Sequence, residues 1–494
     1  MKLTVSGDIN VFYVQTLCMI FFPGERFVEN QEITAETPIM DVFVKNYETY
    51  SYAKATLTYG EKTCTAEKTV DFDPAITKLR SAKISAGNVV LEVGSEMLGY
   101  RPAWGMLTGV RPSKVAMEML LNGNSKTKVK KILANDYFVI PKKAALATDI
   151  AIREQRIVGE PDIRDCSIYV SIPFCPSRCA YCSFVSYTTK KLLSLIPEYL
   201  EKLCRELSGI FDTVRDLGLN LKTVYIGGGT PTILNDEQLE RLLSLIDSKT
   251  DVSRLEEFTL EAGRPDTITR EKLAIARSHG VNRVSVNPQS LNEYVLKSIG
   301  RSHTCENFYE AYDLAKASGI ECINTDLIVG LPGDNFKYFS STFDKILSLD
   351  PENITVHTFC IKKAADILHN NQNIYSIRGG DSAKCVDYSQ LKAAAAGYVP
   401  YYMYRQKNTV GNLENVGFAK EGKEGLYNIY MMEEVHSILA AGAGAVTKLV
   451  EYHPANVTST KIARYFNHKY PYEYLESDMS DQIRERIVEF YESH

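Results

Sequence analysis

The chain has 494 residues, of which 45% are hydrophobic and 24% charged, a composition typical of water-soluble globular proteins. One ordinary hydrophobic core does not grow to this size, so we expect two or three domains. A formal net charge of −5 argues against general binding to nucleic acid or anionic lipid. Eleven scattered cysteines suit a reducing cytosol better than a disulfide-bonded secreted scaffold. We therefore predict a cytoplasmic protein, a monomer, with no nucleic-acid partner and no membrane span.

Residues 1–160 mix strand-like runs with a later helical part, and we predict an N-terminal α+β domain of unknown role there. The apolar run VFYVQTLCMIFF, residues 11–22, is too short to cross a bilayer and lacks a signal-peptide cleavage site, so we interpret it as a core strand. Two X-Pro steps around Trp104, the single tryptophan, indicate a loop that enters a helix at about Ser113. The charged segment 152–165 contains a Gly and a Pro and is interpreted as the linker to the next domain.

Residues 161–365 show a regular alternation of short β-rich runs and amphipathic stretches of helical length. The six β-rich runs are SIYVSIPF, KTVYIGG, EEFTLEA, VNRVSVN, ECINTDLIVG and NITVHTFC. Six strand–helix repeats predict an α/β fold with a parallel sheet, because parallel strands need crossover helices. Six is fewer than the eight of a closed barrel, so a partial (β/α)6 barrel and an open doubly wound sheet both fit. Residues 366–494 are predicted to form a C-terminal extension that completes a substrate site.

Unusual polar residues fall at the C-terminal ends of these runs or just beyond them. Three cysteines follow the first run, and GGGTPT follows the second. Glu261 ends the third run, Gln289 lies just past the fourth, and Asp326 lies within the fifth. Because active sites of parallel α/β folds are built at that edge of the sheet, we expect the site there.

The three cysteines, Cys175, Cys179 and Cys182, have the spacing C-x3-C-x2-C on one loop. A zinc site usually has four protein ligands in two pairs, or histidine and carboxylate among three. Three thiolates can instead hold three irons of a [4Fe–4S] cluster and leave the fourth iron open to a further ligand. Structural zinc and unligated thiols are the alternatives. Cys166 could be offered as a fourth ligand. It precedes the first strand, however, so we expect it at the opposite end of that strand from the loop.

This spacing resembles the signature loop of the radical S-adenosylmethionine (SAM) enzymes. The resemblance implies that SAM chelates the open iron, and that an electron from the cluster cleaves it to methionine and a 5′-deoxyadenosyl radical, which abstracts hydrogen. The protein then supplies positioning and exclusion of water. In GGGTP, residues 227–231, glycines permit close approach of the backbone, and their amides are expected to hydrogen-bond the methionyl end of SAM.

Five stretches in order resemble one branch of these enzymes, the oxygen-independent coproporphyrinogen III dehydrogenases, in the variant of Gram-positive anaerobes. They are YVSIPFCPSRCAYCSF, YIGGGTPT, TLEAGRPDT, RVSVNPQSLNEYVLKSIGRSHT and NTDLIVGLPG, within residues 165–335. The resemblance implies a partial (β/α)6 radical SAM barrel. It also implies that Tyr169, Gly228 and Glu261 contact the cluster-bound SAM.

Members of this branch are described with a second SAM nearby. The resemblance implies that it is bound at the matching positions, which are Tyr181, Gly229, Thr230, Gln289, Arg301 and Asp326. Ile328, and more weakly Cys360, would supply an apolar wall beside adenine. Taken singly, the carboxylates could instead cap helices or form ion pairs, and Arg301 could be a solvated helix end.

Three positions depart from the pattern of the branch. Ser171 stands where a His is common, and Asn287 and Pro288 precede Gln289 where a Gly-containing motif is usual. Tyr427 stands where the haem-chaperone relatives have a His within a motif that ends in Tyr-Trp. The missing histidine removes a haem ligand and argues against the chaperone interpretation.

The implied function is anaerobic oxidative decarboxylation of coproporphyrinogen III to protoporphyrinogen IX in porphyrin biosynthesis, with a cellular one-electron reductant. The substrate carries four carboxylates, so cations are needed to bind it. The candidates are Lys362, Lys363, Arg405 and Lys407, with solvated surface side chains as the alternative. Tyr401, Tyr402 and Tyr404 would pack the macrocycle or belong to a buried strand. The alternative functions are a haem-binding carrier with a vestigial cluster and an anaerobic haem-modifying methyltransferase.

Overall fold

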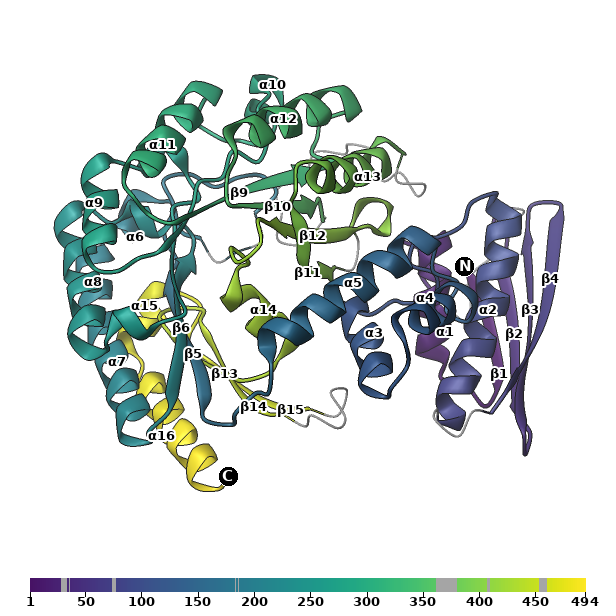
Figure 1. Ribbon diagram of the computed structural model, residues 1–494. Helices are drawn as coiled ribbons and strands as arrows, with labels where there is room; N and C mark the ends of the chain where they lie inside the picture. Colours follow the sequence, from purple (N-terminus) through teal and green to yellow (C-terminus); the bar gives the residue numbers. More distant parts are fainter. Residues whose placement is uncertain are drawn as a thin grey trace. The chain divides into compact units, whose positions relative to one another are not determined.

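The computed structural model describes residues 1–27, 33–34, 36–72, 77–182, 184, 186–360, 380–406, 409–452 and 460–494. Two compact units are distinguished in it (Figure 1). The first contains Met1–Ile152 with two short later segments, among them Tyr404–Glu414. The second contains most of the chain from Arg153 onward. None of the helices in the described ranges has the length and apolar character needed to cross a bilayer.

The first unit is built on a four-stranded sheet of order β1-β2-β3-β4. Its strands are β1 (Lys2–Gly7), β2 (Ile39–Asn46), β3 (Tyr50–Tyr59) and β4 (Lys62–Asp71). β1 is parallel to β2, and the other neighbours are antiparallel. Every second residue of β2 is buried, namely Met40, Val42 and Val44. Helix α2 (Lys78–Leu98) contacts the sheet and helix α1 (Val11–Phe21), so the core of this unit lies between the sheet and these helices.

The run of residues 11–22, expected as a strand, forms helix α1 instead. Asn10 caps its N-terminus, since the Asn10 side chain accepts a hydrogen bond of 2.8 Å from the Phe12 amide. The buried side chains recur at helical spacing: Val14, Leu17, Cys18 and Phe21. The strand prediction was wrong because nearly every position of the run is apolar, so its periodicity does not distinguish a strand from a buried helix.

Three further helices follow, α3 (Pro112–Leu121), α4 (Lys126–Asn135) and α5 (Pro141–Val158). The helix expected at about Ser113 is confirmed as α3. The linker expected over residues 152–165 is wrong in its first half, because α5 continues to Val158. Its Gly and Pro both lie beyond the helix, and helix-compatible charged residues precede them.

A buried ion pair within the first unit joins Lys143 of α5 to Glu414. Glu414 also accepts a hydrogen bond of 2.8 Å from Trp104 Nε1. The Arg405 guanidinium lies 5.6 Å from the centroid of the Trp104 ring and donates to the carbonyl oxygen of Leu107. Arg405, a sequence candidate for binding substrate carboxylates, is thus a buried structural group, and that expectation is corrected.

The second unit is built on an eleven-stranded sheet of order β11-β12-β10-β9-β8-β7-β6-β5-β13-β14-β15. Its six central strands are parallel neighbours in chain order: β5 (Asp165–Ile172), β6 (Asn220–Gly228), β7 (Glu257–Glu261), β8 (Arg283–Ser285), β9 (Cys322–Val329) and β10 (Asn353–Thr358). A doubly wound sheet would reverse its strand order, and this one does not. The partial (β/α)6 barrel is therefore confirmed, and it stays open, since no pairing in the described ranges joins β11 to β15.

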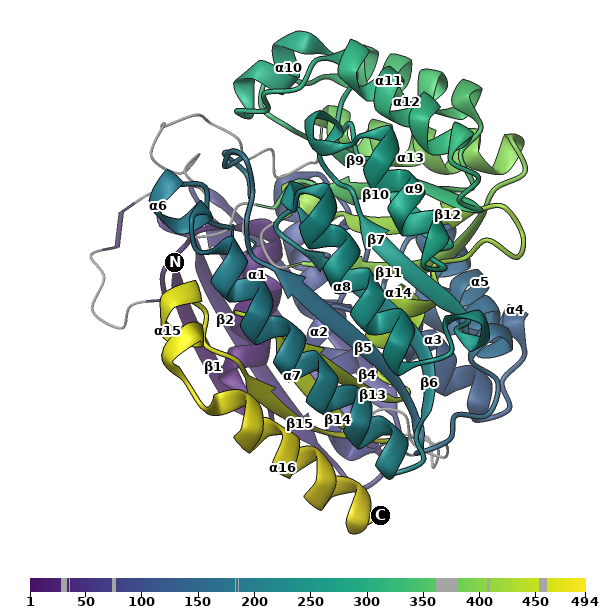
Figure 2. The same cartoon turned by 90° about the vertical axis from the view of Figure 1, so that its left-hand side faces the viewer.

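Helices connect these parallel strands along the outside of the sheet (Figure 2). They are α6 (Lys190–Leu193), α7 (Ile196–Asp216), α8 (Asp236–Lys249), α9 (Arg270–Ser278), α10 (Glu293–Ser298), α11 (Cys305–Ala317) and α12 (Phe336–Leu349). α8 packs between α7 and α9 and begins with a capping box of Asn235 and Gln238. Each crossover thus returns the chain to the same end of the next strand, which gathers the strands' carboxyl ends at one rim.

The C-terminal region adds strands to both edges of the barrel sheet, which the sequence did not indicate. Its elements are α13 (Gly380–Ala395), β11 (Val399–Arg405), β12 (Glu414–Ala419), α14 (Leu426–Glu433), β13 (Ser437–Ala441), β14 (Val446–Glu451), β15 (Lys461–Phe466), α15 (Pro471–Glu476) and α16 (Met479–Glu492). β12 is antiparallel to β10, whereas β13 is parallel to β5. Tyr401 and Tyr402 are buried in β11, as the buried-strand alternative predicts.

Candidate active site

The cysteine loop begins directly after β5, at the carboxyl ends of the parallel strands. Cys175 and Cys179 are 7% and 8% exposed, and Cys182 is half-buried. The Cys175 sulfur lies 3.1 Å from Thr230 Oγ1 in the loop after β6. Burial raises the pKa of the Cys175 thiol to about 11, with the Thr230 hydroxyl opposing, and burial also raises the pKa of Cys182. Metal binding at the Cys175 and Cys182 sulfurs must therefore displace protons.

The glycine loop after β6 is pressed against the cysteine loop. Gly229 and Thr230 donate backbone hydrogen bonds of 2.8 Å each to the carbonyl oxygens of Ile172 and Phe174. A Cβ at Gly229 would lie 2.5 Å from Phe174 O and 3.0 Å from the Cys175 sulfur, so only glycine fits there.

The expectation that the glycine-loop amides donate to SAM stays a prediction, and three of these amides have partners within the protein. The amides of Gly229 and Thr230 already bond the cysteine loop, and that of Gly228 bonds the Glu261 carboxylate. The glycines therefore allow the backbone of this loop to approach the cysteine loop closely, and Gly228 has a φ of +115° there.

Three tyrosines are stacked beside this loop: Tyr169 of β5, Tyr225 of β6 and Tyr427 of α14. The ring centroids of Tyr225 and Tyr427 are 4.4 Å apart, and that of Tyr169 lies 6.1 and 6.2 Å from them. Glu257 of β7 holds the start of α14 in place, since its carboxylate accepts hydrogen bonds from the amides of Leu426 and Tyr427. Tyr427 is 5% exposed, so the position of the missing histidine is filled by a packed aromatic ring.

Glu261, the last residue of β7, accepts a hydrogen bond of 2.5 Å from the Tyr225 hydroxyl. Burial raises the pKa of Glu261 to about 7, the negative charge of Asp326 adds to the rise, and the Tyr225 hydrogen bond opposes it. Glu261 therefore changes charge near neutral pH.

The surroundings of Asp326 of β9 shift its pKa in the opposite direction from that of Glu261. Its carboxylate accepts hydrogen bonds from the side-chain amides of Asn287, at 2.9 Å, and Asn324, at 2.7 Å, and lies 3.7 Å from His357 Nε2. Burial alone would raise the pKa of Asp326, but the imidazole and the amide of Asn324 outweigh it and hold the pKa below its ordinary value. Two nearby carboxyl groups are thus driven to different charges, an arrangement common at catalytic sites.

Gln289 and Arg301 complete the rim. The backbone of Gln289 has a φ of +65° and pairs with β9. Its backbone N–H donates to Asp326 O at 3.0 Å, and its backbone carbonyl oxygen accepts from the Ile328 amide. Arg301 Nη2 donates to the Tyr181 hydroxyl at 3.3 Å, so it holds the cysteine loop. Gln289 Oε1 and Arg301 Nε are buried and have no hydrogen-bond partner among the described residues.

Arg264, which the sequence did not single out, is 3% exposed and reaches the cysteine loop. Its Nη1 donates to the Ser177 hydroxyl at 3.0 Å and lies 3.7 Å from the Cys179 sulfur. An arginine just after a strand carries no local signal for such a role. The contact depends on a segment 85 residues away in sequence.

The remaining candidates are dispersed. Ile328 is buried in β9 on the same face as Asp326, and Cys360 lies two residues beyond β10. Cys166 is the second residue of β5, at the opposite end from the cysteine loop. Ser171, in the usual histidine position, donates to Ala443 O at 2.9 Å. The proposed substrate cations Lys362, Lys363 and Lys407 lie outside the described residues.

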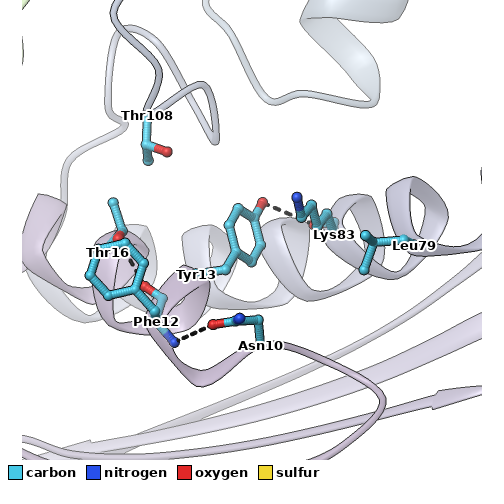
Figure 3. A pocket seen from close by; sticks show the side chains of 7 residues that line it. All are labelled: Asn10, Phe12, Tyr13, Thr16, Leu79, Lys83 and Thr108. Atoms are coloured by element: carbon cyan, nitrogen blue, oxygen red, sulfur yellow. Dashed lines mark hydrogen bonds between the residues drawn. The ribbon is translucent and has the colours of Figure 1, made fainter. Parts of the chain in front are cut away.

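A separate pocket of about 460 Å³ lies in the first unit (Figure 3). It is lined by Asn10, Phe12, Tyr13, Thr16, Leu79, Lys83 and Thr108. Its polar groups serve the fold, since Asn10 caps α1 and the Tyr13 hydroxyl donates to the Lys83 carbonyl at 3.1 Å. We assign no cofactor to it.

The chain is similar to known proteins of one superfamily. Residues 169–346 match the radical SAM superfamily. The oxygen-independent coproporphyrinogen-III oxidase-like protein HemZ of Bacillus subtilis is 37% identical over 396 residues, which are 78% of this chain and 78% of that protein. The heme chaperone HemW of the same species is 33% identical over 282 residues, 56% of this chain and 70% of its own. The solved structure of coproporphyrinogen III oxidase (HemN) from Escherichia coli shares the fold, with a TM-score of 0.51, 21% identity and coverage of 68% of this chain and 73% of that one.

The superfamily uses a [4Fe–4S] cluster and SAM, and the residues at the rim fit both groups. Cluster thiolates bind separate irons, and three soft sulfur ligands suit them. The unpaired Gln289 Oε1 and Arg301 Nε offer an acceptor and a donor to a polar ligand. The chain therefore belongs to the radical SAM superfamily and, within it, to the family of the coproporphyrinogen-III oxidase-like protein HemZ.

Proposed function

We propose that this radical SAM protein is an anaerobic coproporphyrinogen III dehydrogenase, which converts two propionates of the macrocycle to vinyl groups. Each conversion removes a hydrogen atom from the β-carbon, CO2 from the carboxylate and one electron. When bound, the cluster and SAM would supply the 5′-deoxyadenosyl radical that takes the hydrogen atom. Relatives named as an oxidase-like protein and as a chaperone both support membership of this group, so the choice depends on the site itself.

We propose that Cys175, Cys179 and Cys182 hold the cluster, because they share one loop at the rim, on which Cys175 and Cys179 are buried and Cys182 is half-buried. Glu261 would accept a hydrogen bond from the amino group of SAM, and Asp326 from hydroxyl groups of a ribose. Gln289 Oε1 and Arg301 Nε, which are buried and have no hydrogen-bond partner among the described residues, support further polar contacts at the rim, which suits a second SAM.

The observation that carries the enzyme proposal over the chaperone is the stacking of Tyr427. A tyrosine can bind haem iron only as a phenolate. Burial raises the pKa of Tyr427 well above its ordinary value, and its ring is packed against those of Tyr225 and Tyr169. Tyr427 is therefore a poor haem ligand, and its place in the stack is a packing role.

The test is an anaerobic assay of the reconstituted protein with a reductant, SAM and coproporphyrinogen III. We expect methionine, 5′-deoxyadenosine and CO2 to appear together with vinyl porphyrinogen products. The matched control is the Cys179→Ser variant, which should lose all three products. Methionine and 5′-deoxyadenosine without CO2 would reject the substrate but keep the radical chemistry. Haem in the purified protein would favour the carrier, and methylated linear tetrapyrroles would favour the haem-modifying enzyme.

A further inference from the structure

Arg264 is held in a fixed orientation by an acidic partner in its own segment. It directly precedes the short 3-10 helix η3 (Pro265–Thr267), after β7. Its Nε and Nη2 donate to the two carboxylate oxygens of Asp266, at 3.0 Å each, which is the bidentate geometry of a strong arginine–carboxylate pair. Nη2 also donates to Ser302 Oγ at 2.6 Å, and that hydroxyl donates back to Asp266 at 3.0 Å. These three hydrogen bonds, made by Nε and Nη2, therefore fix the direction of the third nitrogen, Nη1.

That nitrogen, Nη1, points at the cysteine loop. It donates to Ser177 Oγ at 3.0 Å, approaches Ser177 O at 3.4 Å and lies 3.7 Å from Cys179 Sγ. The positive charge also acts on Cys175, where it opposes the rise in pKa caused by burial. The guanidinium is almost fully buried, so solvent and salt screen this charge weakly.

The other buried arginine at the rim shows a different pattern. Arg301 directs its Nη1 to the carbonyl oxygens of Gly263 and Asn287 and its Nη2 to the Tyr181 hydroxyl. Those contacts secure the backbone and Tyr181. The charge of Arg301 also acts on Cys179, but Arg264 is the one of the two whose N–H group is directed at the Cys179 sulfur. If Arg264 had a purely structural role, its hydrogen bonds to Asp266, Ser302 and Ser177 would suffice, and a contact with the Cys179 sulfur would not be needed.

We propose that Arg264 raises the reduction potential of the cluster held by Cys175, Cys179 and Cys182, acting as a positioning and electrostatic residue through Cys179. This inference rests on the proposed ligand set, and it is independent of the substrate. Reduction adds one negative charge to a centre that already carries three thiolates. A nearby fixed cation and an N–H donor to sulfur stabilise the more negative state more strongly, and such hydrogen bonds are among the factors that set cluster potentials.

The test is a redox titration of the anaerobically reconstituted full-length protein, followed by electron paramagnetic resonance. For Arg264→Gln we expect the equilibrium constant for reduction to fall about tenfold, which is 59 mV for a one-electron couple. Arg264→Lys keeps the positive charge but loses the planar guanidinium, so its reduction potential should lie between those of Arg264→Gln and the wild type. Arg277→Gln, an exposed arginine on α9, is the matched control and should leave the potential unchanged.

A second variant keeps Arg264 and is expected to shift the reduction potential in the opposite direction. Asp266→Asn abolishes the negative charge that partly neutralises the guanidinium, so the potential should rise. This variant decides the question if Arg264→Gln assembles too little cluster to titrate. Full cluster content with an unchanged potential in Arg264→Gln, or an unchanged potential in Asp266→Asn, overturns the inference.

The wild-type protein separates this inference from the proposed function. A wild-type chain that assembles no cluster overturns the ligand set and the role of Arg264 together. A wild-type chain that carries its cluster but releases no CO2 from coproporphyrinogen III overturns only the substrate.

Discussion

Replacement of Gly229 by alanine tests whether the glycine loop supports the cysteine loop. The added Cβ would lie 2.5 Å from Phe174 O and 3.0 Å from the Cys175 sulfur. Ordinary contacts begin near 3.5 Å, so the two loops must separate by about 1 Å. That movement strains the backbone hydrogen bonds that Gly229 and Thr230 donate across the gap, both 2.8 Å long. Overpacking of this kind costs about 1–3 kcal/mol of folding free energy.

The expected result is a protein that folds but holds less cluster, because Cys175 is displaced relative to the other two thiols. Iron and sulfide per chain, measured after anaerobic reconstitution, should fall well below the wild-type values, and the thermal midpoint should fall modestly. Gly109→Ala is the matched control, since no atom lies within 4 Å of the added Cβ. Wild-type iron content and an unchanged thermal midpoint in Gly229→Ala would refute the reasoning.

Three further predictions concern the titratable groups. Because the pKa of Glu261 is about 7 and its carboxylate form is proposed to bind SAM, affinity measured by anaerobic calorimetry should weaken about tenfold from pH 8 to pH 6, and Glu261→Gln should abolish this dependence. Tyr225→Phe removes a hydrogen bond that lowers this pKa, so the midpoint of the same pH profile should move to higher pH; an unmoved midpoint would contradict the assignment. Glu414→Gln removes the carboxylate that pairs with the buried Lys143, so denaturant unfolding of the first unit should show a loss of about 3–5 kcal/mol, whereas Glu421→Gln, in an exposed pair, should change little.

The parallel sheet and its rim were predictable because their signals are local, whereas the choice of a partial barrel came from the family resemblance. Each strand is a short β-rich run followed by a helix of amphipathic pattern, and parallel pairing then places all carboxyl ends together. Cys175, Glu261 and Asp326 could be placed at that rim without knowledge of any contact. The helix at residues 11–22 was missed because a uniformly apolar run carries no period.

Contacts between distant segments were not predictable. Arg264 contacts Cys179 because the loops after β7 and β5 turn toward each other. The sequence of neither loop indicates that the other is its neighbour. The amides of Gly229 and Thr230 join two loops of the protein, which the sequence did not indicate. The extra strands of the C-terminal region likewise pair with β5 and β10, far away in sequence.

The formal net charge of −5 says little about this site, because the charges that matter are buried and balanced locally. Arg264 is neutralised by Asp266 on one side and faces a thiol on the other. Asp326 is held ionised by amides and an imidazole, whereas Glu261, a short distance away, is poised near neutral pH. A neutral Glu261 would keep two negative charges from meeting in one buried space. An N–H donor such as the amino group of SAM would favour the ionised form of Glu261, so below pH 7 binding of SAM should release a proton from the site.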